Sequence, residues 1–337
     1  MDPPKAETDG FEVGEVLTGP DDCRIVLYYD HLRFILVMTK PEIREDGDVV
    51  ADLFLKIEEA ENDPDEMMFD RYLEDVRELA ILACKHTMYT LAASVPKPRS
   101  KQLSLEDFLH PATFCLQLRA MKGKLQAVGI DDISEFASMH EPVPLAMDFV
   151  PRSVPALTPS VEIEFIEDLF MRKILKVSKH GEVCVFKSAT QGNEDQLRRE
   201  ISVLQQISDK WEPDHPDHPH VPRLLGLVTS GGQVIGMLEE FIDGTNLHEL
   251  DLDDASSAQR RKWKRQIEQA IKQLHQSGVV WGDVKPENVL IDKAAHAWLV
   301  DFGGSSTDGW VDEDLAETME GDSQGLRRLV EFLGVRH

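Results

Sequence analysis

Basic residues are scarce in this chain of 337 residues. Lys and Arg together number 36 against 62 Asp and Glu, so the formal net charge at pH 7 is −26. A chain with this charge repels the phosphate backbone of nucleic acids and the anionic headgroups of membranes. We therefore expect neither nucleic acid nor a membrane surface among its partners.

Cysteines and long apolar runs are scarce as well. The four cysteines, Cys23, Cys84, Cys115 and Cys184, lie far apart and form no CxxC pair, which argues against a disulfide framework or a thiolate zinc site. No apolar run reaches the roughly 18 residues of a membrane-spanning helix, and the polar, acidic start of the chain does not resemble a signal peptide. The sequence therefore predicts an intracellular, cytoplasmic protein and gives no indication of its oligomeric state.

A proline-bearing stretch divides the chain into two parts. Residues 141–160 contain five prolines, which are too close together for a helix or a central strand, so we predict a linker there. Before it we expect an acidic tail over residues 1–20 and an α+β domain over residues 21–140. After it we expect a second domain over residues 161–337.

Within the first part, the apolar patterns predict strands and two helices. Residues 23–38 read as two strands around a tight turn, and residues 49–57 as a third strand. Helical spacing predicts a long helix over residues 65–93 and another over residues 105–128. The apolar stripe of the long helix comprises Met68, Tyr72, Val76, Leu79 and Leu82. No motif in this part indicates a function.

The second part has a different order of elements. We predict strands over residues 161–166, 173–177, 182–187, 223–228, 234–241, 289–291 and 297–300, and helices over residues 193–207 and 257–276. Several strands with one inserted helix, followed by a helical part, indicate an α+β fold rather than a regular βαβ alternation.

One stretch in this part carries a catalytic pattern. The sequence WGDVKPENVLID, residues 281–292, is followed nine residues later by an Asp-Phe-Gly element. This pattern resembles the protein-kinase superfamily, whose catalytic loop has an Asp, a Lys two residues on and an Asn five residues on. Asp283, Lys285 and Asn288 match that loop, and Asp301 begins the Asp-Phe-Gly element. An acidic surface turn is the plainer interpretation of each motif alone, but the two at this spacing favour the resemblance.

The resemblance implies a role for each matching residue. Phosphoryl transfer needs two acids with different tasks, because one accepts the proton of the attacking hydroxyl and the other holds Mg²⁺ on the phosphates. Asp283 would be the catalytic base and Lys285 would balance charge on the moving phosphoryl group. Asn288 and Asp301 would bind the metal, for which amide and carboxylate oxygens are suitable ligands.

Residues upstream test the idea independently. Lys187 ends a predicted strand and matches the strand-three lysine of the family. Glu200 lies on the apolar stripe of the helix over residues 193–207, where a carboxylate is costly unless it is paired. We expect Lys187 and Glu200 to pair and hold the phosphates of ATP; the alternative is that Glu200 lies at the edge of the stripe, in water.

The expected hinge follows a polar residue. The run MLEEFIDG resembles the hinge of the family, whose backbone would bind adenine near Glu240, Phe241 and Ile242. In this register Glu239 takes the gatekeeper position, which is usually apolar. Either the register is shifted by one residue or the adenine pocket is unusually polar.

The sequence departs from the family in three places. Residues 167–171, where a glycine-rich loop would cover the phosphates, contain no glycine. Trp281-Gly282-Asp283 replaces the usual His-Arg-Asp, which removes the arginine that pairs with a phosphorylated activation loop. Only 34 residues follow Gly303, and among them Asp322 takes the position of a buried Asp of the family. This combination resembles a group of fungal protein-kinase-like proteins.

These observations predict a bilobal protein-kinase-like fold with a minimal C-terminal lobe, preceded by an α+β domain. We expect an ATP- and Mg²⁺-dependent kinase that transfers the γ-phosphoryl group to a hydroxyl. Lys285-Pro286 resembles the loop of Ser/Thr kinases and favours a protein acceptor. The Gly282 substitution leaves a small-molecule acceptor as an alternative, and the missing glycine-rich loop leaves a pseudokinase that acts as a binding module.

The run EGDSQGLRRLVEFL, residues 320–333, resembles the central C-lobe helix of the family and suggests a role for the N-terminal domain. Leu326, Leu329, Val330, Phe332 and Leu333 form an apolar set too large to leave in water. We expect residues 20–140 to cover this set, the alternative being an independent domain on a flexible tether.

Overall fold

The computed structural model describes residues 10–19, 21–40, 50, 52, 54–55, 66–96, 102–121, 124–130, 141–146, 156–212, 215, 218–304 and 307–335. The chain divides into two compact units. Unit 1 comprises Met1–Leu103 and Asp107–Met139, and unit 2 comprises Ser104–Glu106 and His140–His337.

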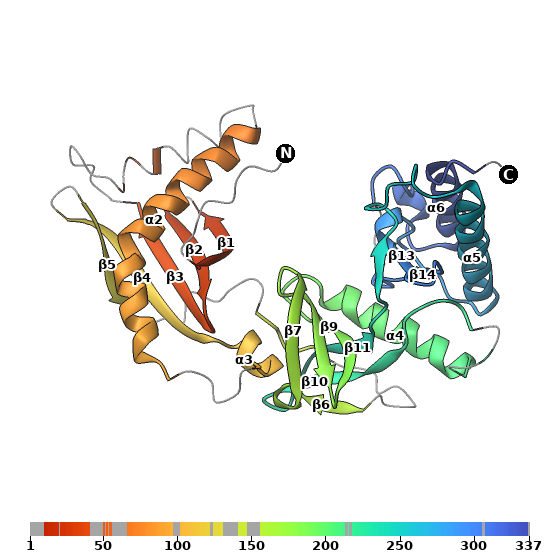
Figure 1. Ribbon diagram of the computed structural model, residues 1–337, viewed down its shortest axis with the longest axis horizontal. Helices are drawn as coiled ribbons and strands as arrows, with labels where there is room; N and C mark the ends of the chain where they lie inside the picture. The colour runs from red at the N-terminus through yellow and green to blue at the C-terminus, as the bar shows by residue number, and fades with distance from the viewer. Residues whose placement is uncertain are drawn as a thin grey trace. The chain divides into compact units, whose positions relative to one another are not determined.

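Unit 1 is built on a five-stranded sheet with a long helix against it (Figure 1). The strands lie in the order β1 (Glu12–Thr18), β2 (Asp22–Tyr29), β3 (Leu32–Thr39), β4 (Ala112–Met121) and β5 (Lys124–Ile130). All neighbours are antiparallel except β3 and β4, which run parallel and are connected through helix α2 (Glu66–Ser94). Such a parallel pair needs a crossover connection, which α2 supplies.

Several expectations for this unit are wrong. Strand β1 lies within the predicted acidic tail, and the described residues of 49–57 are helical rather than extended. The predicted helix over 105–128 is a single turn, α3 (Leu105–Leu109), followed by β4 and β5. The reason is the alternation of Leu116 and Leu118, both buried, with polar neighbours, which is the period of a strand.

Helix α2 forms as expected, and Val76 of its predicted stripe is buried; the side chains of Met68 and Tyr72 lie outside the described residues. Leu79 and Leu82 are exposed. The buried face is instead lined by side chains four residues apart, Val76, Ala80, Cys84 and Met88, which share one apolar core with the sheet. Ile81 is buried in the same core, and Tyr89 and Leu91 pack against it.

Unit 2 begins with a six-stranded sheet beside one helix (Figure 1). The strands lie in the order β6 (Leu157–Pro159), β10 (Leu224–Ser230), β11 (Gln233–Glu240), β9 (Glu182–Ser188), β8 (Ile174–Lys179) and β7 (Ile163–Phe170), and the helix is α4 (Glu194–Lys210). The predicted strands and helix of this region are all present, although residues 161–162 belong to a short 3-10 helix, Ser160–Glu162.

The remainder of unit 2 is mostly helical around a small sheet. The three short strands are β12 (Gly244–Asn246), β13 (Val289–Asp292) and β14 (Ala297–Leu299), the helices are α5 (Ser257–Gln276) and α6 (Met319–Phe332), and 3-10 turns lie at Pro286–Asn288 and Glu313–Leu315. Helix α5 begins at a capping box formed by Ser256 and Gln259. The fold is α+β, as the sequence predicts.

The described residues of the predicted linker belong to unit 2. Strand β6 pairs with β10, and the backbone amides of Val143 and Leu145 donate to the carbonyls of Ala189 and Val234, each over 2.8 Å. Leu145 is buried in the core of the unit. The described part of this stretch, residues 141–146 and 156–160, is therefore packed in unit 2, and Pro159 is the last residue of strand β6.

The apolar side chains of helix α6 are covered within unit 2, so the reason for expecting residues 20–140 to cover them is wrong. Leu329, Val330 and Leu333 are buried in a core that α5 also lines. Phe332 packs edge-on against Trp310, with ring centroids 6.0 Å apart. Unit 2 covers the apolar set with its own side chains.

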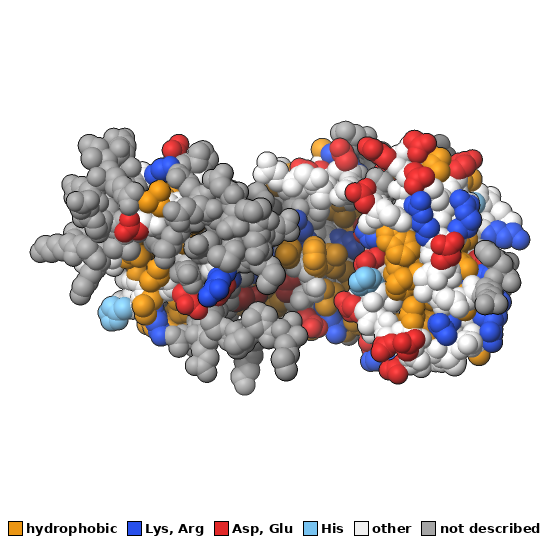
Figure 2. Space-filling view, turned by 90° about the horizontal axis from the view of Figure 1, so that it is seen from above, with side chains coloured by type: hydrophobic (Ala, Val, Ile, Leu, Met, Phe, Trp, Pro, Cys, Tyr) orange, Lys and Arg blue, Asp and Glu red, His pale blue; other side chains and the backbone are white. Residues whose placement is uncertain are grey.

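Three further features of the described residues concern surface charge, helix hydrophobicity and the thiols. On the face of unit 2 that Figure 2 shows, acidic side chains lie among basic ones. None of the helices in the described parts of the chain is long and apolar enough to cross a membrane. All four cysteines are buried free thiols, and burial raises the pKa of Cys23 and of Cys84 to about 12.

Candidate active site

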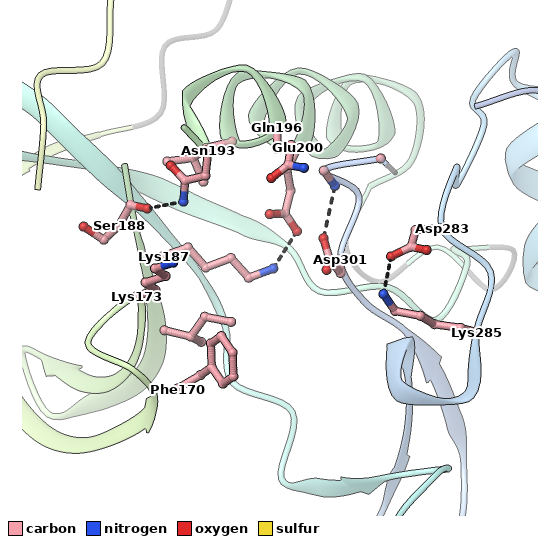
Figure 3. A pocket seen from close by; sticks show the side chains of 14 residues that line it. Phe170, Lys173, Lys187, Ser188, Asn193, Gln196, Glu200, Asp283, Lys285 and Asp301 are labelled. Atoms are coloured by element: carbon pink, nitrogen blue, oxygen red, sulfur yellow. Dashed lines mark hydrogen bonds and ion pairs between the residues drawn. The ribbon is translucent and has the colours of Figure 1, made fainter. Parts of the chain in front are cut away.

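Lys187 and Glu200 form a buried ion pair. Lys187 lies on β9 and Glu200 on α4, and the two side chains point toward one another (Figure 3). Lys187 Nζ lies 2.6 Å from Glu200 Oε1, which also accepts the backbone amide of Phe302 over 3.1 Å. The carboxylate on the apolar stripe is thus satisfied by one charge and one amide, as burial of a charged group requires.

Glu239 is a second carboxylate on the same lysine. Its Oε1 lies 3.3 Å from Lys187 Nζ, and its Oε2 is buried with no hydrogen-bond partner among the described residues. The position before the hinge is therefore polar, which favours the second of the two readings that the sequence left open.

The electrostatics of the site are dominated by carboxylates. Burial by itself lowers the pKa of Lys187, but Glu200, Glu239 and Asp301 outweigh burial and raise that pKa above its ordinary value. Burial raises the pKa of Glu239 to about 7, against the pull of Lys187. One ammonium therefore faces three acidic groups.

Asp283 lies at the centre of a second cluster. Its Oδ2 is 2.7 Å from Lys285 Nζ and accepts Asn288 Nδ2 over 2.9 Å, while its Oδ1 accepts the hydroxyl of Thr307 over 3.0 Å. Lys285 Nζ also donates to Thr307 Oγ1 over 3.1 Å. The 3-10 turn Pro286–Asn288 folds the chain so that Asn288 faces back to Asp283.

Asp322 on α6 holds the backbone that precedes Asp283. Its two oxygens accept the backbone amides of Trp281 and Gly282 over 2.9 and 2.8 Å, and His275 Nε2 lies 2.7 Å from Oδ2. Asp322 is 1% exposed. A buried carboxylate that accepts two amides fixes the backbone leading into Asp283.

Asp301 follows β14 in a left-handed backbone conformation, with φ of 62°. Its Oδ1 accepts the amide of Gly303 over 3.2 Å. Figure 3 shows it between the Lys187–Glu200 pair and the Asp283–Lys285 pair. This backbone conformation costs a residue with a side chain about 1–3 kcal/mol, and such strain collects at functional sites.

Two pockets bring these residues together. One of about 270 Å³ is lined by Lys187, Glu200, Asp283, Lys285 and Asp301, among others. The other, of about 470 Å³, is lined by the expected hinge residues Glu240, Phe241 and Ile242 together with Lys187, Glu239, Asn288 and Asp301. Every residue predicted for the site therefore lines one of the two pockets, and Lys187 and Asp301 line both.

The turn between β7 and β8 replaces the glycine-rich loop. Met171 and Arg172 both adopt positive φ, and the Asp168 carboxylate accepts the amide of Arg172 with both oxygens, over 3.0 and 2.9 Å. Phe170 is 54% exposed and lines both pockets. The turn thus presents the Phe170 ring to both pockets, while the Arg172 amide is already bonded to Asp168.

Two residues of the site were not predicted from the sequence. The hydroxyl of Thr307 bridges Asp283 and Lys285, and the guanidinium of Arg199 contacts the backbone of both catalytic segments. Both act across long stretches of chain, so no local pattern marks them. The sequence feature that could have pointed to Arg199 is its position next to Glu200.

The residues fit a nucleotide-bound magnesium rather than a protein metal cage. Among the described residues, no three His, Cys, Asp or Glu side chains gather into a metal site. Asn288 donates to Asp283 through its nitrogen, so those hydrogen bonds leave its oxygen available, and Asp301 supplies a carboxylate. One carboxylate, one amide oxygen and phosphate oxygens make a ligand set typical of Mg²⁺.

A lysine–glutamate pair facing an Asp-Lys-Asn loop and an Asp-Phe-Gly element defines a protein-kinase-like site. Residues 173–319, a little under half of the chain, match the family model for the protein kinase domain. This match and the α+β fold support the similarity of that segment to the protein-kinase-like superfamily.

Curated relatives agree over the same part. The chain is 33% identical over 114 residues to CBL-interacting protein kinase 17 of Oryza sativa subsp. japonica, covering 33% of this chain and 23% of that one. It is 32% identical over 125 residues to the carbon catabolite-derepressing protein kinase of Saccharomyces cerevisiae, covering 36% and 18%. It is 31% identical over 114 residues to the hormonally up-regulated neu tumor-associated kinase of Mus musculus, covering 34% and 15%. The chain spans less than a quarter of the length of these relatives.

Replacing Glu239 by Gln should change how stability depends on pH. In the wild type the pKa of Glu239 is raised from 4.5 to about 7, so unfolding between these values releases a proton and rising pH favours unfolding. Relative to the variant, the wild type should therefore lose stability as pH rises from 4.5 through 7, by on the order of 3 kcal/mol at most. Chemical denaturation at pH 5 and pH 8 measures the difference.

The matched control is Glu240→Gln, which removes a neighbouring carboxylate that pairs with Arg223 at 2.9 Å. It should shift stability by a similar amount at both pH values. A Glu239→Gln effect that is equally independent of pH contradicts the raised pKa.

Proposed function

We propose that this chain is an ATP- and Mg²⁺-dependent kinase that transfers the γ-phosphoryl group to a Ser or Thr hydroxyl of a protein. The observation that carries the proposal is the convergence of Lys187, Glu200, Asp283 and Asp301 on one pocket. The match of residues 173–319 to the protein kinase domain and the kinase names of the relatives support it.

Each residue has a task in this proposal. Lys187, held by Glu200, binds phosphate oxygens, and the backbone near Glu240–Ile242 binds adenine. Asp283 orients the acceptor hydroxyl and takes its proton, while Lys285, 2.7 Å from that carboxylate, steadies the transferred group.

Metal binding completes the proposed site. Asn288 and Asp301 would hold the Mg²⁺, which neutralises charge on the phosphates when bound. A bound Mg²⁺ would also offset the negative charge of the carboxylates that surround Lys187.

The surroundings of Asp283 support a hydroxyl acceptor. Thr307 Oγ1 donates to Asp283 Oδ1 over 3.0 Å, so the proposed base already accepts a hydrogen bond from an aliphatic hydroxyl. A protein Ser or Thr presents the same group. We also propose that the domain resembles a group of fungal protein-kinase-like proteins with the same Trp-Gly-Asp loop. In this chain, α6 holds that loop through Asp322.

A transfer assay tests the proposal. The full chain, γ-labelled ATP, Mg²⁺ and a mixed pool of protein substrates should give label on Ser or Thr that survives acid hydrolysis. The Asp283→Asn variant should give none above background. Label found only on small molecules in a parallel metabolite pool would replace the protein acceptor by a small-molecule one.

A binding module is the second candidate, because the turn at Asp168–Arg172 offers no free amide from Arg172 to a phosphate. A thermal-shift titration separates the two candidates. Stabilisation by ATP only with Mg²⁺, together with label transfer, supports the kinase. Stabilisation without any transfer supports the module.

A further inference from the structure

Arg199 connects helix α4 to both catalytic segments. Its Nη1 donates to the carbonyls of Phe302 and, over 3.2 Å, of Trp281, and its Nη2 donates to the carbonyl of Val280 over 3.2 Å. These acceptors precede Asp283 on one side and lie within the Asp-Phe-Gly element on the other. One guanidinium therefore joins three segments that are distant in sequence.

The backbone around this guanidinium is shaped to admit it. A Cβ at Gly282 would lie 2.6 Å from Arg199 Nη2, and one at Gly304 would lie 3.0 Å from Arg199 Nε and 2.6 Å from Glu317 Oε1. Both glycines adopt positive φ, of 93° and 75°. Glu317 Oε2 lies 3.6 Å from Arg199 Nε. Two glycines thus leave the space and one carboxylate balances the charge.

The contacts of Arg199 also restrain its neighbour in the sequence, Glu200. Glu200 follows Arg199 directly, and Glu200 Oε1 accepts the amide of Phe302 while Arg199 donates to the carbonyl of the same residue. Arg199 and Glu200, on one turn of α4, therefore both hydrogen-bond the backbone of Phe302 in the Asp-Phe-Gly element. A movement of α4 that withdraws Glu200 from Lys187 must also break the Arg199 contacts.

We propose that Arg199 is a positioning residue, which keeps Glu200 on Lys187 by fastening α4 to the backbone of residues 280–282 and 302. The pair is then assembled by a guanidinium built into the chain, without modification of the segment after Gly303. The expected effect on MgATP binding rests on the proposed kinase function, whereas the contacts of Arg199 do not depend on it. Gly282 stands where the catalytic loop of the family has an arginine. Because Gly282 has no side chain, it leaves room for Arg199 of α4.

The chemistry of the contact is specific to arginine. Guanidinium carries five N–H donors in a planar fork, whereas a lysine ammonium is a single point on a flexible stem. Arg199→Lys keeps the charge but cannot reach three carbonyls and Glu317 at once. We therefore expect it to recover only a small part of the wild-type behaviour.

The test is a double-mutant cycle on MgATP binding by the full chain, measured by calorimetry. Arg199→Ala should weaken binding by about 10-fold, and Glu200→Ala by at least as much. In the Glu200→Ala background, Arg199→Ala should add less than about twofold, because its effect passes through Glu200. The control is Arg198→Ala, whose side chain instead pairs with Asp195 over 3.2 Å and should change binding by less than about twofold.

Two results overturn the proposal. One is binding by Arg199→Ala within twofold of the wild type; the other is a full additional loss in the Glu200→Ala background, which a separate structural role would give. Gly282→Ala, whose Cβ would displace the guanidinium, should reproduce the Arg199→Ala loss, and wild-type affinity in that variant also counts against the proposal.

A second measurement keeps the inference separate from the proposed function. Amide hydrogen exchange of α4 in the unliganded chain should be faster in Arg199→Ala than in the wild type or in Arg198→Ala. If the wild type binds no MgATP, the kinase proposal fails, while faster exchange still supports the fastening of α4. Unchanged exchange in Arg199→Ala overturns the fastening itself.

Discussion

Replacing Asp283 by Asn should leave MgATP affinity almost unchanged and lower turnover by about 100-fold or more. Asparagine has nearly the same shape, so its oxygen can still accept from Thr307 or Lys285, now 3.0 and 2.7 Å from the carboxylate. It cannot accept a proton from the substrate hydroxyl. Calorimetric titration with MgATP and steady-state transfer assays measure the two effects separately.

Asp312→Asn is the matched control for this substitution. Asp312 is an exposed carboxylate of the same unit that pairs with Arg328 over 2.9 Å, away from both pockets. Turnover and affinity should both stay near wild type in the control. If Asp283→Asn lost affinity and turnover in equal measure, Asp283 would be a structural residue rather than the base.

The elements of unit 2 were largely predictable because local signals agree with the packing. Helix α5 covers Ser257–Gln276, the predicted range, since the capping box at Ser256 and Gly278 with φ of 74° mark its two ends. The core-facing side chains of α5 follow a single helical stripe that unit 2 buries. Where sequence period, caps and burial coincide, the prediction succeeds.

In unit 1 the same signals conflict. The region of β4 and β5 is rich in residues that suit a helix, and its two-residue alternation is short, so the helical interpretation prevailed. Strand β1 carries charged residues and forms an edge of the sheet, where only one neighbour is needed. Its assignment depends on β2, and no local pattern supplies a partner.

The candidate site shows the same division. Glu200 could be matched with Lys187 because a carboxylate on an apolar stripe needs a partner and the lysine was the obvious one. Thr307 and Arg199 make contacts with residues 22 or more positions away, so their roles depend on the folded chain. Glu239 is an intermediate case, because the sequence placed it before the hinge but did not predict its ion pair with Lys187.

Asp301→Asn should abolish transfer while leaving the fold intact. The amide oxygen of asparagine can still accept from Gly303, whose amide donates to Asp301 Oδ1 over 3.2 Å, so the turn survives. What disappears is the negative charge that would attract Mg²⁺, and Asn288 alone is a neutral ligand. The substitution also removes one of the three carboxylates that act on Lys187.

We expect Asp301→Asn to change ATP affinity differently in the absence and in the presence of Mg²⁺. ATP affinity without metal should stay the same or rise, because the pocket becomes less negative. The gain in affinity that Mg²⁺ gives the wild type should be lost. Calorimetry with ATP in EDTA and with ATP in Mg²⁺, beside Asp312→Asn as the control, measures both quantities. Near wild-type turnover in Asp301→Asn, or an undiminished Mg²⁺-dependent gain, would show that the Asp-Phe-Gly element does not hold the metal.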